Sequence, residues 1–489
     1  MKNIIEKIKR KDNIVIFILF FLISLGISLN IYLESSDEVW NFQNVYKMYN
    51  GFKIYEEINV IITPLFFYMA EGIFHLFGAN LCVFRISHCV FISILFLITY
   101  NILKKLKIPK ALSVLTVLMM ILQEFFLLIR TSFNYNNMAL LFFVIGIYYL
   151  INEKTRKNIL IQSIITLLIM LTKQNIGIYY LLGNILYFSI SKQDIKHKIK
   201  EILKYIGIVF IGGILFILYL IMDHNLYNFL NYTLGGISEF ANENLICDFS
   251  GLVLMIGIIL INIGMSIIFI KKNFLSEEKK ENIKILLIFS MMLSLISYPI
   301  FNWTHIIMGI YLMIVNIVYM AYLLFEDFKE GMTKILKIIN GITIFGMIIF
   351  SCLNMYTWIK AITNSDYPYS WEDPFFGGML GREEYEENEK VVKYIEENEK
   401  NVIVFSNRAA LYMVPLKRNN GDFDLPFKGN FGIKGVDGLI EKVDNMKNAQ
   451  FLIYKNENKS IYQESDKVKE HIKNTKTYVG EIEGFEIYE

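Results

Sequence analysis

Two adjacent carboxylates, Asp37 and Glu38, stand directly after the first long apolar segment of the chain, residues 14–33. A carboxylate near the hydrocarbon boundary is costly unless it is paired, hydrated or used, and two adjacent ones repel each other. A carboxylate fixed beside a hydroxyl can remove its proton while the oxygen attacks an electrophile. The pair is therefore a candidate general base. The alternative, compatible with it, is that Asp37 caps the following helix in a solvated loop.

A second group of candidate residues is cationic. Arg85, Arg130 and Lys173 stand near the ends of apolar segments, in loops that otherwise hold few lysines or arginines. A positioned cation stabilises the negative charge that grows on a phosphate leaving group, and an arginine holds phosphate oxygens bidentately. For each cation alone, the alternative is contact with lipid headgroups. His305 begins another apolar segment beside Trp303; it can donate to a phosphate or a sugar hydroxyl, or be an ordinary interfacial histidine.

The composition indicates an integral membrane protein. Hydrophobic residues make up 54% of the 489 residues, charged residues 19%, and the mean hydropathy is +0.43, well to the apolar side of soluble chains. The net charge of +2 gives no reason to expect a nucleic-acid partner. The four cysteines are scattered without a CxxC pair, so neither a disulfide framework nor a zinc site is predicted.

Apolar segments recur along the first part of the chain, and hydropathy predicts about eleven transmembrane helices. The segments lie at about residues 14–33, 81–103, 111–129, 138–151, 159–171, 176–190, 205–222, 251–270, 285–300, 305–325 and 335–358.

Lysine and arginine gather in one alternate set of loops. These are the N-terminus and residues 104–110, 154–157, 192–204, 271–284 and 329–337. The positive-inside rule makes this set cytoplasmic, so an odd number of spans places Asp37 and the C-terminal tail outside. We expect a multi-pass protein of the cell (plasma) membrane, with its N-terminus cytoplasmic and its C-terminal domain external.

The chain is predicted to have two domains. Residues 1–358 form the all-α membrane domain, and residues 359–489, where polar runs replace apolar ones, form a small external α/β domain with strands at 402–405 and 451–454. The first external loop, residues 34–80, is expected to hold two interfacial helices. On the first of these, Lys47 is expected to be solvated.

Three stretches of this loop carry a family resemblance. Glu34-Ser-Ser-Asp37-Glu38-Val-Trp-Asn-Phe, Tyr49-Asn-Gly51-Phe-Lys-Ile-Tyr55 and Thr63-Pro64-Leu-Phe-Phe-Tyr68 together resemble the first external loop of the GT-C superfamily, of the protein O-mannosyltransferase and aminoarabinose-transferase type. The resemblance implies a GT-C-like fold, with Asp37 as general base and Glu38 assisting or orienting it. It also implies a polyprenyl-phosphate-linked sugar donor, inversion at the anomeric carbon, and no metal or other cofactor.

The predicted function is therefore inverting transfer of a sugar from a polyprenyl-phosphate donor to an acceptor hydroxyl on the outer face of the membrane. Arg130, Lys173, Arg85 and His305 are the predicted donor-phosphate ligands. The partners are the lipid-linked donor, membrane lipid, and a glycan, glycolipid or protein acceptor. One alternative is a lipid-linked sugar flippase or transporter, for which charges near mid-bilayer and internal repeats are typical. Another is a polysaccharide polymerase or ligase, which usually relies on a late external loop with arginines.

Overall fold

A computed structural model describes residues 2–29, 36–126, 133–151, 159–190, 194–236, 246–272, 275–324, 329–363, 370–378, 382–406, 408–424, 430–455 and 463–489. The chain divides into two compact units. Unit 1 comprises Met1–Leu29, Ile86–Leu215 and Leu245–Tyr356, and unit 2 comprises Asn30–Arg85, Phe216–Asn244 and Thr357–Glu489. The first loop and the C-terminal residues therefore belong to one unit. The predicted domain boundary after residue 358 stays a prediction.

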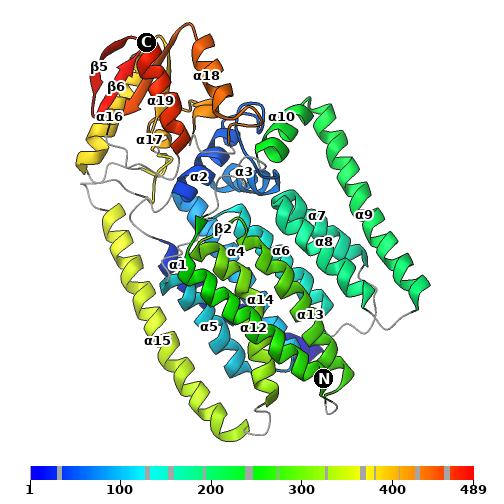
Figure 1. Cartoon of the computed structure of the whole chain (residues 1–489). Coiled ribbons are helices and arrows are strands. Elements are labelled where there is room, and N and C mark those ends of the chain that lie inside the picture. Colours follow the sequence, from blue (N-terminus) through cyan, green and yellow to red (C-terminus); the bar gives the residue numbers. More distant parts are fainter. Residues whose placement is uncertain are drawn as a thin grey trace. The chain divides into compact units, whose positions relative to one another are not determined.

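Unit 1 is helical, as its apolar segments predict (Figure 1). Its helices are α1 (Lys2–Ser28), α5 (Lys110–Phe126), α6 (Tyr135–Leu150), α7 (Ile159–Thr172), α8 (Gln174–Ser189), α12 (Phe249–Lys271), α13 (Glu277–Ser294) and α14 (Trp303–Leu324). The helices α4 (Leu81–Lys105), α9 (Ile195–Met222) and α15 (Lys329–Ile362) run from one unit into the other along the chain. Each predicted apolar segment overlaps one of these helices.

The long apolar helices fit a multi-pass membrane protein. Within the described residues, 6 helices are long and apolar enough to cross a membrane. They are α1, over Lys11–Ser28, with α4, α9, α12, α14 and α15. Several other helices, among them α6 and α7, are shorter apolar ones. The membrane class is therefore confirmed, and the number of about eleven spans stays a prediction.

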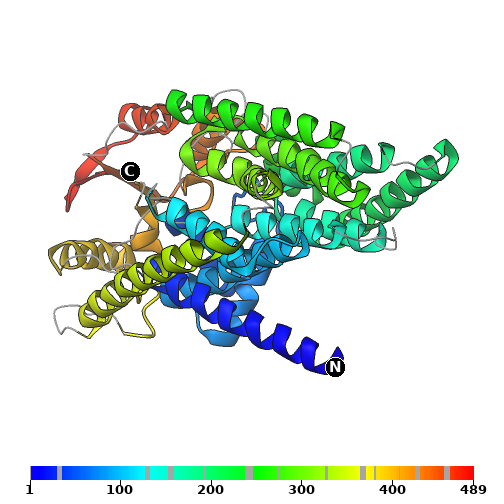
Figure 2. The ribbon, with the colours of Figure 1, turned by 90° about the horizontal axis from the view of Figure 1, so that it is seen from below.

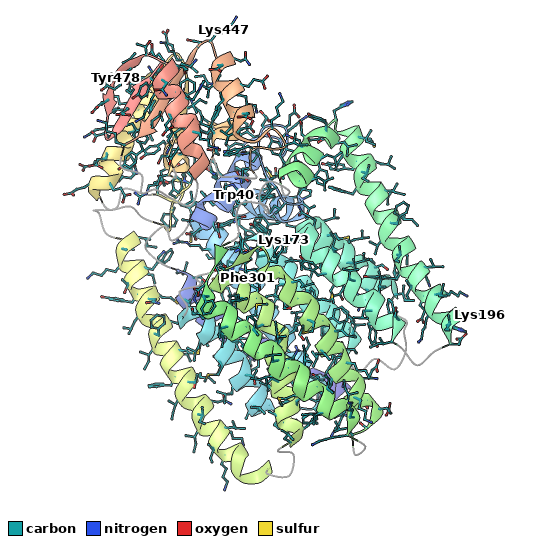
Figure 3. The ribbon with its side chains drawn as sticks, in the orientation of Figure 1. Trp40, Lys173, Lys196, Phe301, Lys447 and Tyr478 are labelled. Carbon is teal, nitrogen blue, oxygen red and sulfur yellow. The ribbon has the colours of Figure 1, made fainter. Side chains whose placement is uncertain are left out.

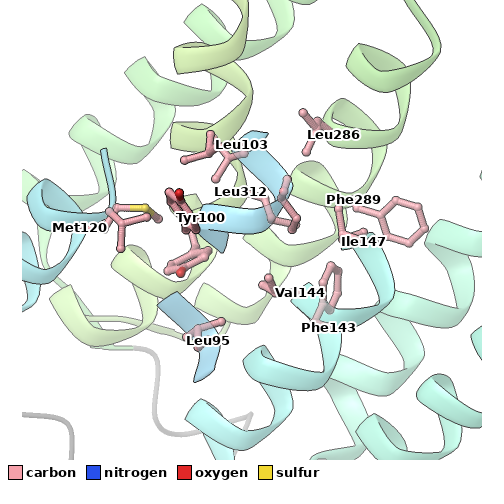
Figure 4. Packing of buried hydrophobic residues seen from close by; sticks show 14 of the residues in the cluster. Leu95, Tyr100, Leu103, Met120, Phe143, Val144, Ile147, Leu286, Phe289 and Leu312 are labelled. Atoms are coloured by element: carbon pink, nitrogen blue, oxygen red, sulfur yellow. The ribbon is translucent and has the colours of Figure 1, made fainter. Parts of the chain in front are cut away.

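Aromatic and aliphatic side chains fill the core of unit 1 (Figure 4). The ring of Phe143 packs edge-on against Tyr180 at a centroid distance of 4.7 Å and against Phe289 at 6.0 Å. This joins α6, α8 and α13 through interlocking rings. Such close packing replaces the hydrophobic effect as the force between helices in lipid.

Buried amides tie α12, α13 and α14 together, and Figure 2 shows these helices side by side. Asn262 donates to Ser290 at 3.0 Å, and Asn316 donates to Asn262 at 2.8 Å and to Ser266 at 3.0 Å. All four side chains are fully buried. Because hydrocarbon offers no alternative partners, such hydrogen bonds fix which helix faces meet.

The C-terminal residues of unit 2 form a four-stranded sheet in the order β3-β4-β6-β5. The strands are β3 (Asn401–Phe405), β4 (Ala449–Tyr454), β5 (Tyr478–Ile482) and β6 (Phe485–Tyr488). Strands β3 and β4 pair in parallel, and the other neighbours pair antiparallel. The two predicted strands are confirmed. Strands β5 and β6 form a hairpin around Glu483-Gly484, where Gly484 has φ 79°. Such a left-handed conformation favours glycine.

Helices cover both faces of this sheet, because alternate strand residues are apolar on both sides. The helices are α16 (Arg382–Glu397), α17 (Ala409–Met413), α18 (Gly435–Asn445) and α19 (Gln463–Thr475). On one face Ile403 and Phe451 pack with α18 and α19; on the other Val402 and Leu452 pack with α16 and α17. The small α/β layer predicted for the tail is therefore present.

The remaining helices and strands of the described residues are short. They are α10 (Leu226–Leu230), η1 (Asn231–Gly236), β1 (Ile246–Cys247), η2 (Leu295–Ser297), β2 (Ile300–Phe301) and η3 (Gly421–Phe423).

The two predicted helices of the first loop are α2 (Ser36–Tyr49) and α3 (Leu65–Phe77). Helix α3 ends at Gly78, whose φ of 101° and N–H bond to the Phe74 carbonyl make a glycine cap. Helix α2 differs from expectation on its polar side. Asn44 is 1% exposed and Lys47 is 3% exposed, so the prediction of a solvated Lys47 is wrong. Contacts with residues far along the chain cover that face.

Candidate active site

The two predicted catalytic carboxylates lie in the first turn of α2, where the helix dipole favours negative charge. Consecutive residues of a helix point about 100° apart. Asp37 is consequently exposed, whereas Glu38 is buried at 4% exposure. Asn41 donates from Nδ2 to the Asp37 carbonyl at 2.8 Å, which ties this turn down. Asp37 lies inside the helix start, one residue after Ser36.

Glu38 forms a buried, bidentate ion pair with Arg85. Arg85 donates from Nε to Oε1 and from Nη2 to Oε2, both at 2.8 Å. Its Nη1 donates to the Gly377 carbonyl at 2.7 Å, and Trp358 donates to the same carbonyl at 3.1 Å. A fork-to-carboxylate pair of this kind is strong and directional. It engages both oxygens of Glu38, which leaves Asp37 as the exposed carboxylate of the two.

Aromatic rings hold α2 in place around this pair. The Phe42 ring lies 5.9 Å from Phe74, 5.7 Å from Phe84 and 5.7 Å from Phe375. Trp40, labelled in Figure 3, packs edge-on against Phe67 at 6.1 Å. These contacts connect α2 with α3, with the first turn of α4 and with a C-terminal loop. The turn that holds Asp37 and Glu38 is thus part of a packed assembly.

The predicted phosphate ligand Lys173 lies in unit 1, in the turn between α7 and α8 (Figure 3). Its Nζ donates to Asn136 Oδ1 at 2.5 Å and lies 5.3 Å from the centre of the Tyr135 ring. Asn134 begins α6 as its N-cap and accepts from the Asn137 N–H at 3.0 Å. An amide oxygen and a ring face are thus among the contacts of the lysine, and both are typical of an oriented ammonium group.

His305, also in unit 1, lies in the first turn of α14. Asn302 Oδ1 accepts both the His305 N–H at 3.0 Å and a bond to Nδ1 at 2.7 Å. Because that oxygen only accepts, Nδ1 carries a hydrogen. Nε2 then accepts in the neutral ring and donates in the protonated ring. Lys173 lies within electrostatic range of this histidine. Two of the predicted phosphate ligands are therefore brought together.

The remaining predicted ligand, Arg130, lies outside the described residues. Among the residues that are described, no group of three or more histidines, cysteines or carboxylates is placed to hold a metal ion.

Sequence reasoning missed several partners in the site. Asn302 stands three residues before His305, so its amide was a readable signal. Asn136 lies 37 positions from Lys173 in the sequence. Gly377 and Trp358 contribute through backbone and indole contacts with residues far away in the sequence. No local pattern could have pointed to these two.

Comparison with known proteins supports the first-loop resemblance. Residues 62–221 match the family model described as dolichyl-phosphate-mannose-protein mannosyltransferase. The matched range includes Arg85, Arg130 and Lys173, and begins after Asp37 and Glu38. No curated protein matches the chain.

Two solved structures are similar over nearly the whole chain. The apo structure of ArnT from Cupriavidus metallidurans is 11% identical, covers 98% of both chains and has a TM-score of 0.56. The structure of ArnT from the same organism bound to undecaprenyl phosphate is 11% identical, covers 97% of both chains and has a TM-score of 0.58. The chain therefore has the ArnT-like GT-C fold, and its residues 62–221 match the model of the dolichyl-phosphate-mannose-protein mannosyltransferase family.

Proposed function

We propose that the protein transfers a sugar, with inversion, from a polyprenyl-phosphate-linked donor to an acceptor hydroxyl on the outer face of the membrane. The observation that supports this proposal most directly is that two adjacent carboxylates have different environments. Arg85 engages both oxygens of Glu38, and the neighbouring Asp37 is exposed at the start of the same helix. The pairing of Glu38 supports a structural role for that residue, and the exposure of Asp37 supports its assignment as the base.

In the proposed reaction Asp37 accepts the proton of the acceptor hydroxyl. The oxygen attacks the anomeric carbon from the face opposite the phosphate, and the bond between that carbon and the phosphate oxygen breaks. The electron pair of the broken bond stays on the phosphate, which leaves as polyprenyl phosphate. Phosphate is a good leaving group, so a single base suffices and no general acid is required.

Cations stabilise the charge that develops on the departing phosphate. Lys173 is held by Asn136 and Tyr135, and His305 by Asn302, so both are oriented before a ligand arrives. We assign this role to Lys173, with Arg130 and the protonated form of His305 assisting. Arg85 was also predicted to bind the phosphate; its pairing with Glu38 favours a positioning role instead. The undecaprenyl phosphate bound by ArnT supports a polyprenyl donor.

We further propose that the protein lies in the plasma membrane with its C-terminal domain external. A polyprenyl donor fits this placement, because it carries a sugar to a face where nucleotide sugars are absent. The acceptor is a glycan, a glycolipid or a protein.

Replacement of Asp37 by asparagine tests the proposal. The purified wild type, given a panel of polyprenyl-phosphate sugars and a membrane extract as acceptor, is expected to release polyprenyl phosphate. Asp37→Asn is expected to lower the rate by at least about 10²-fold, because the base is lost. Glu56→Gln is the matched control, since Glu56 is an exposed carboxylate of the same loop; its rate should equal that of the wild type.

Other outcomes favour other functions. Equal rates in wild type and Asp37→Asn would remove Asp37 from its role. No release with any donor, together with movement of a lipid-linked sugar across vesicles, would establish the flippase. Release that depends on a second lipid-linked glycan as acceptor would identify a polymerase or ligase.

A further inference from the structure

Helix α2 carries a second buried charge, Lys47, in its last turn. Its Nζ forms an ion pair with Asp424, which follows η3 in the C-terminal part of unit 2. The side chains are 3% and 2% exposed. Water and salt screen a buried pair of this kind only weakly. The contact is therefore a directional link between the first loop and the C-terminal domain.

Two hydrogen bonds flank this ion pair. Asn419 donates from Nδ2 to the Glu57 carbonyl at 2.6 Å, and Asn59 donates from Nδ2 to the Asn430 carbonyl at 3.0 Å. The first loop is thus held by residues on both sides of Asp424. All these contacts are polar, and each depends on a defined donor and acceptor.

The ion pair between Lys47 and Asp424 is not an efficient way to stabilise the fold. Among the described residues, buried atoms without a hydrogen-bond partner include Gln43 Oε1, Asn44 Nδ2 and Asp424 Oδ1, and each costs free energy. Burial also lowers the pKa of Lys47 to about 7, because desolvation disfavours the ammonium form. Replacing a buried ion pair by apolar residues is often neutral or stabilising. What the ion pair supplies is a defined geometry.

The two ends of α2 are fixed in the same manner. Glu38 pairs with Arg85 in the first turn, and Lys47 pairs with Asp424 in the last. A helix is a rigid rod with a rise of about 1.5 Å per residue, so a shift or rotation at one end is transmitted to the other. Asp37 stands on this rod next to Glu38.

We propose that Lys47 and Asp424 are positioning residues, and that their ion pair uses the C-terminal domain to set the direction in which α2 presents Asp37. The proposal rests on the proposed function of Asp37 as base. A misplacement of about 1 Å from a remote change can cost about 10²-fold in rate. The C-terminal domain then belongs to the catalytic apparatus without touching the reacting atoms.

The test is a double variant, Lys47→Met with Asp424→Leu, in the full-length protein. We expect a melting temperature equal to or above that of the wild type. The kcat for polyprenyl phosphate release should fall at least about 10-fold with little change in the KM for the donor. The matched control is Lys434→Met with Glu441→Leu, an exposed ion pair of the same unit. This control should leave kcat unchanged.

Two further variants test the role of the ion pair independently of the apolar double variant. The charge swap Lys47→Asp with Asp424→Lys should recover part of kcat, because it restores the pair. If the apolar pair does not fold, Asp424→Asn, which keeps the side-chain volume, should still lower kcat at constant KM. Full kcat in a folded apolar pair, or in Asp424→Asn, would overturn the proposal.

A distance measurement separates this proposal from the proposed function. Spin labels at Lys53→Cys and Lys447→Cys, with Cys247 and Cys352 replaced by serine, report on the first loop and the C-terminal domain. We expect the apolar pair to shift or broaden their distance distribution, and an unchanged distribution would contradict the proposal. A wild type that releases no polyprenyl phosphate would overturn the proposed function while leaving this result standing.

Discussion

At the scale of single residues, one step along a helix separates the roles of two carboxylates. Glu38 points inward and is engaged by Arg85, whereas Asp37 points outward from the same turn. The sequence offered both as candidates for the base. Burial and the bidentate pairing distinguish them, because both oxygens of Glu38 already accept hydrogen bonds from Arg85.

Removing the charge of Glu38 tests this assignment. Glu38→Gln leaves the Arg85 guanidinium buried without its counter-charge, and we expect a loss of about 3–5 kcal/mol in the free energy of unfolding. The rate should fall as well, because the first turn of α2 loses its anchor. Thermal unfolding and polyprenyl phosphate release measure the two effects.

The double variant Glu38→Gln with Arg85→Met completes that test. It removes the unpaired charge and should recover most of the stability while the rate stays low. Recovery of both would show that the pair contributes only to folding.

At the scale of elements, close backbone approach joins α1 and α15 within unit 1. A Cβ on Gly26 would lie 2.2 Å from Ser351 Cβ and 2.4 Å from its Cα. Asn354 donates to the Gly26 carbonyl at 3.0 Å, and Ser351 to the Ile23 carbonyl at 3.3 Å. Small residues permit this approach, and packing and hydrogen bonding then hold the helices together in lipid.

Gly26→Ala is therefore expected to destabilise the protein by about 1–3 kcal/mol through overpacking. Gly341→Ala is the matched control on α15, because a Cβ there meets nothing within 4 Å. The control should be neutral or slightly stabilising, since alanine favours a helix more than glycine does. Melting temperatures in one detergent compare the two variants. Equal melting temperatures would show that α1 and α15 are not held by this contact.

At the scale of the whole molecule, the distribution of lysine and arginine predicts orientation. Lys196 lies in a cation-rich segment that the positive-inside rule places in the cytoplasm. Lys447 lies in the C-terminal domain, which is predicted to be external. Both side chains are exposed in the structure and are labelled in Figure 3.

Cysteine labelling in intact cells checks this orientation, with Cys247 and Cys352 replaced by serine. A membrane-impermeant maleimide should label Lys447→Cys without permeabilisation and Lys196→Cys only after it. The reverse pattern would place the proposed chemistry on the cytoplasmic face and remove the reason for a polyprenyl donor.

Much of the architecture was predictable because it depends on local sequence. Apolar runs of about 20 residues indicate membrane helices. Short apolar runs within a polar region indicate the strands of the tail. The Asp37-Glu38 pair is a candidate site because it directly follows an apolar segment. The resemblance of the first loop to GT-C enzymes was readable from consecutive residues. Of these features, the helices, the sheet of the tail and the fold are confirmed.

Tertiary structure decided which polar residues act together. Arg85 reaches Glu38 across 47 residues of sequence, and Lys47 reaches Asp424 across 377. Lys47 was predicted to be solvated because an isolated amphipathic helix turns its polar face to water. In the folded chain its ammonium group pairs with Asp424, in the C-terminal part of the same unit. The hydropathy of a segment predicts whether it prefers lipid or water. Which distant side chain takes the place of water around a polar residue depends on the folded chain.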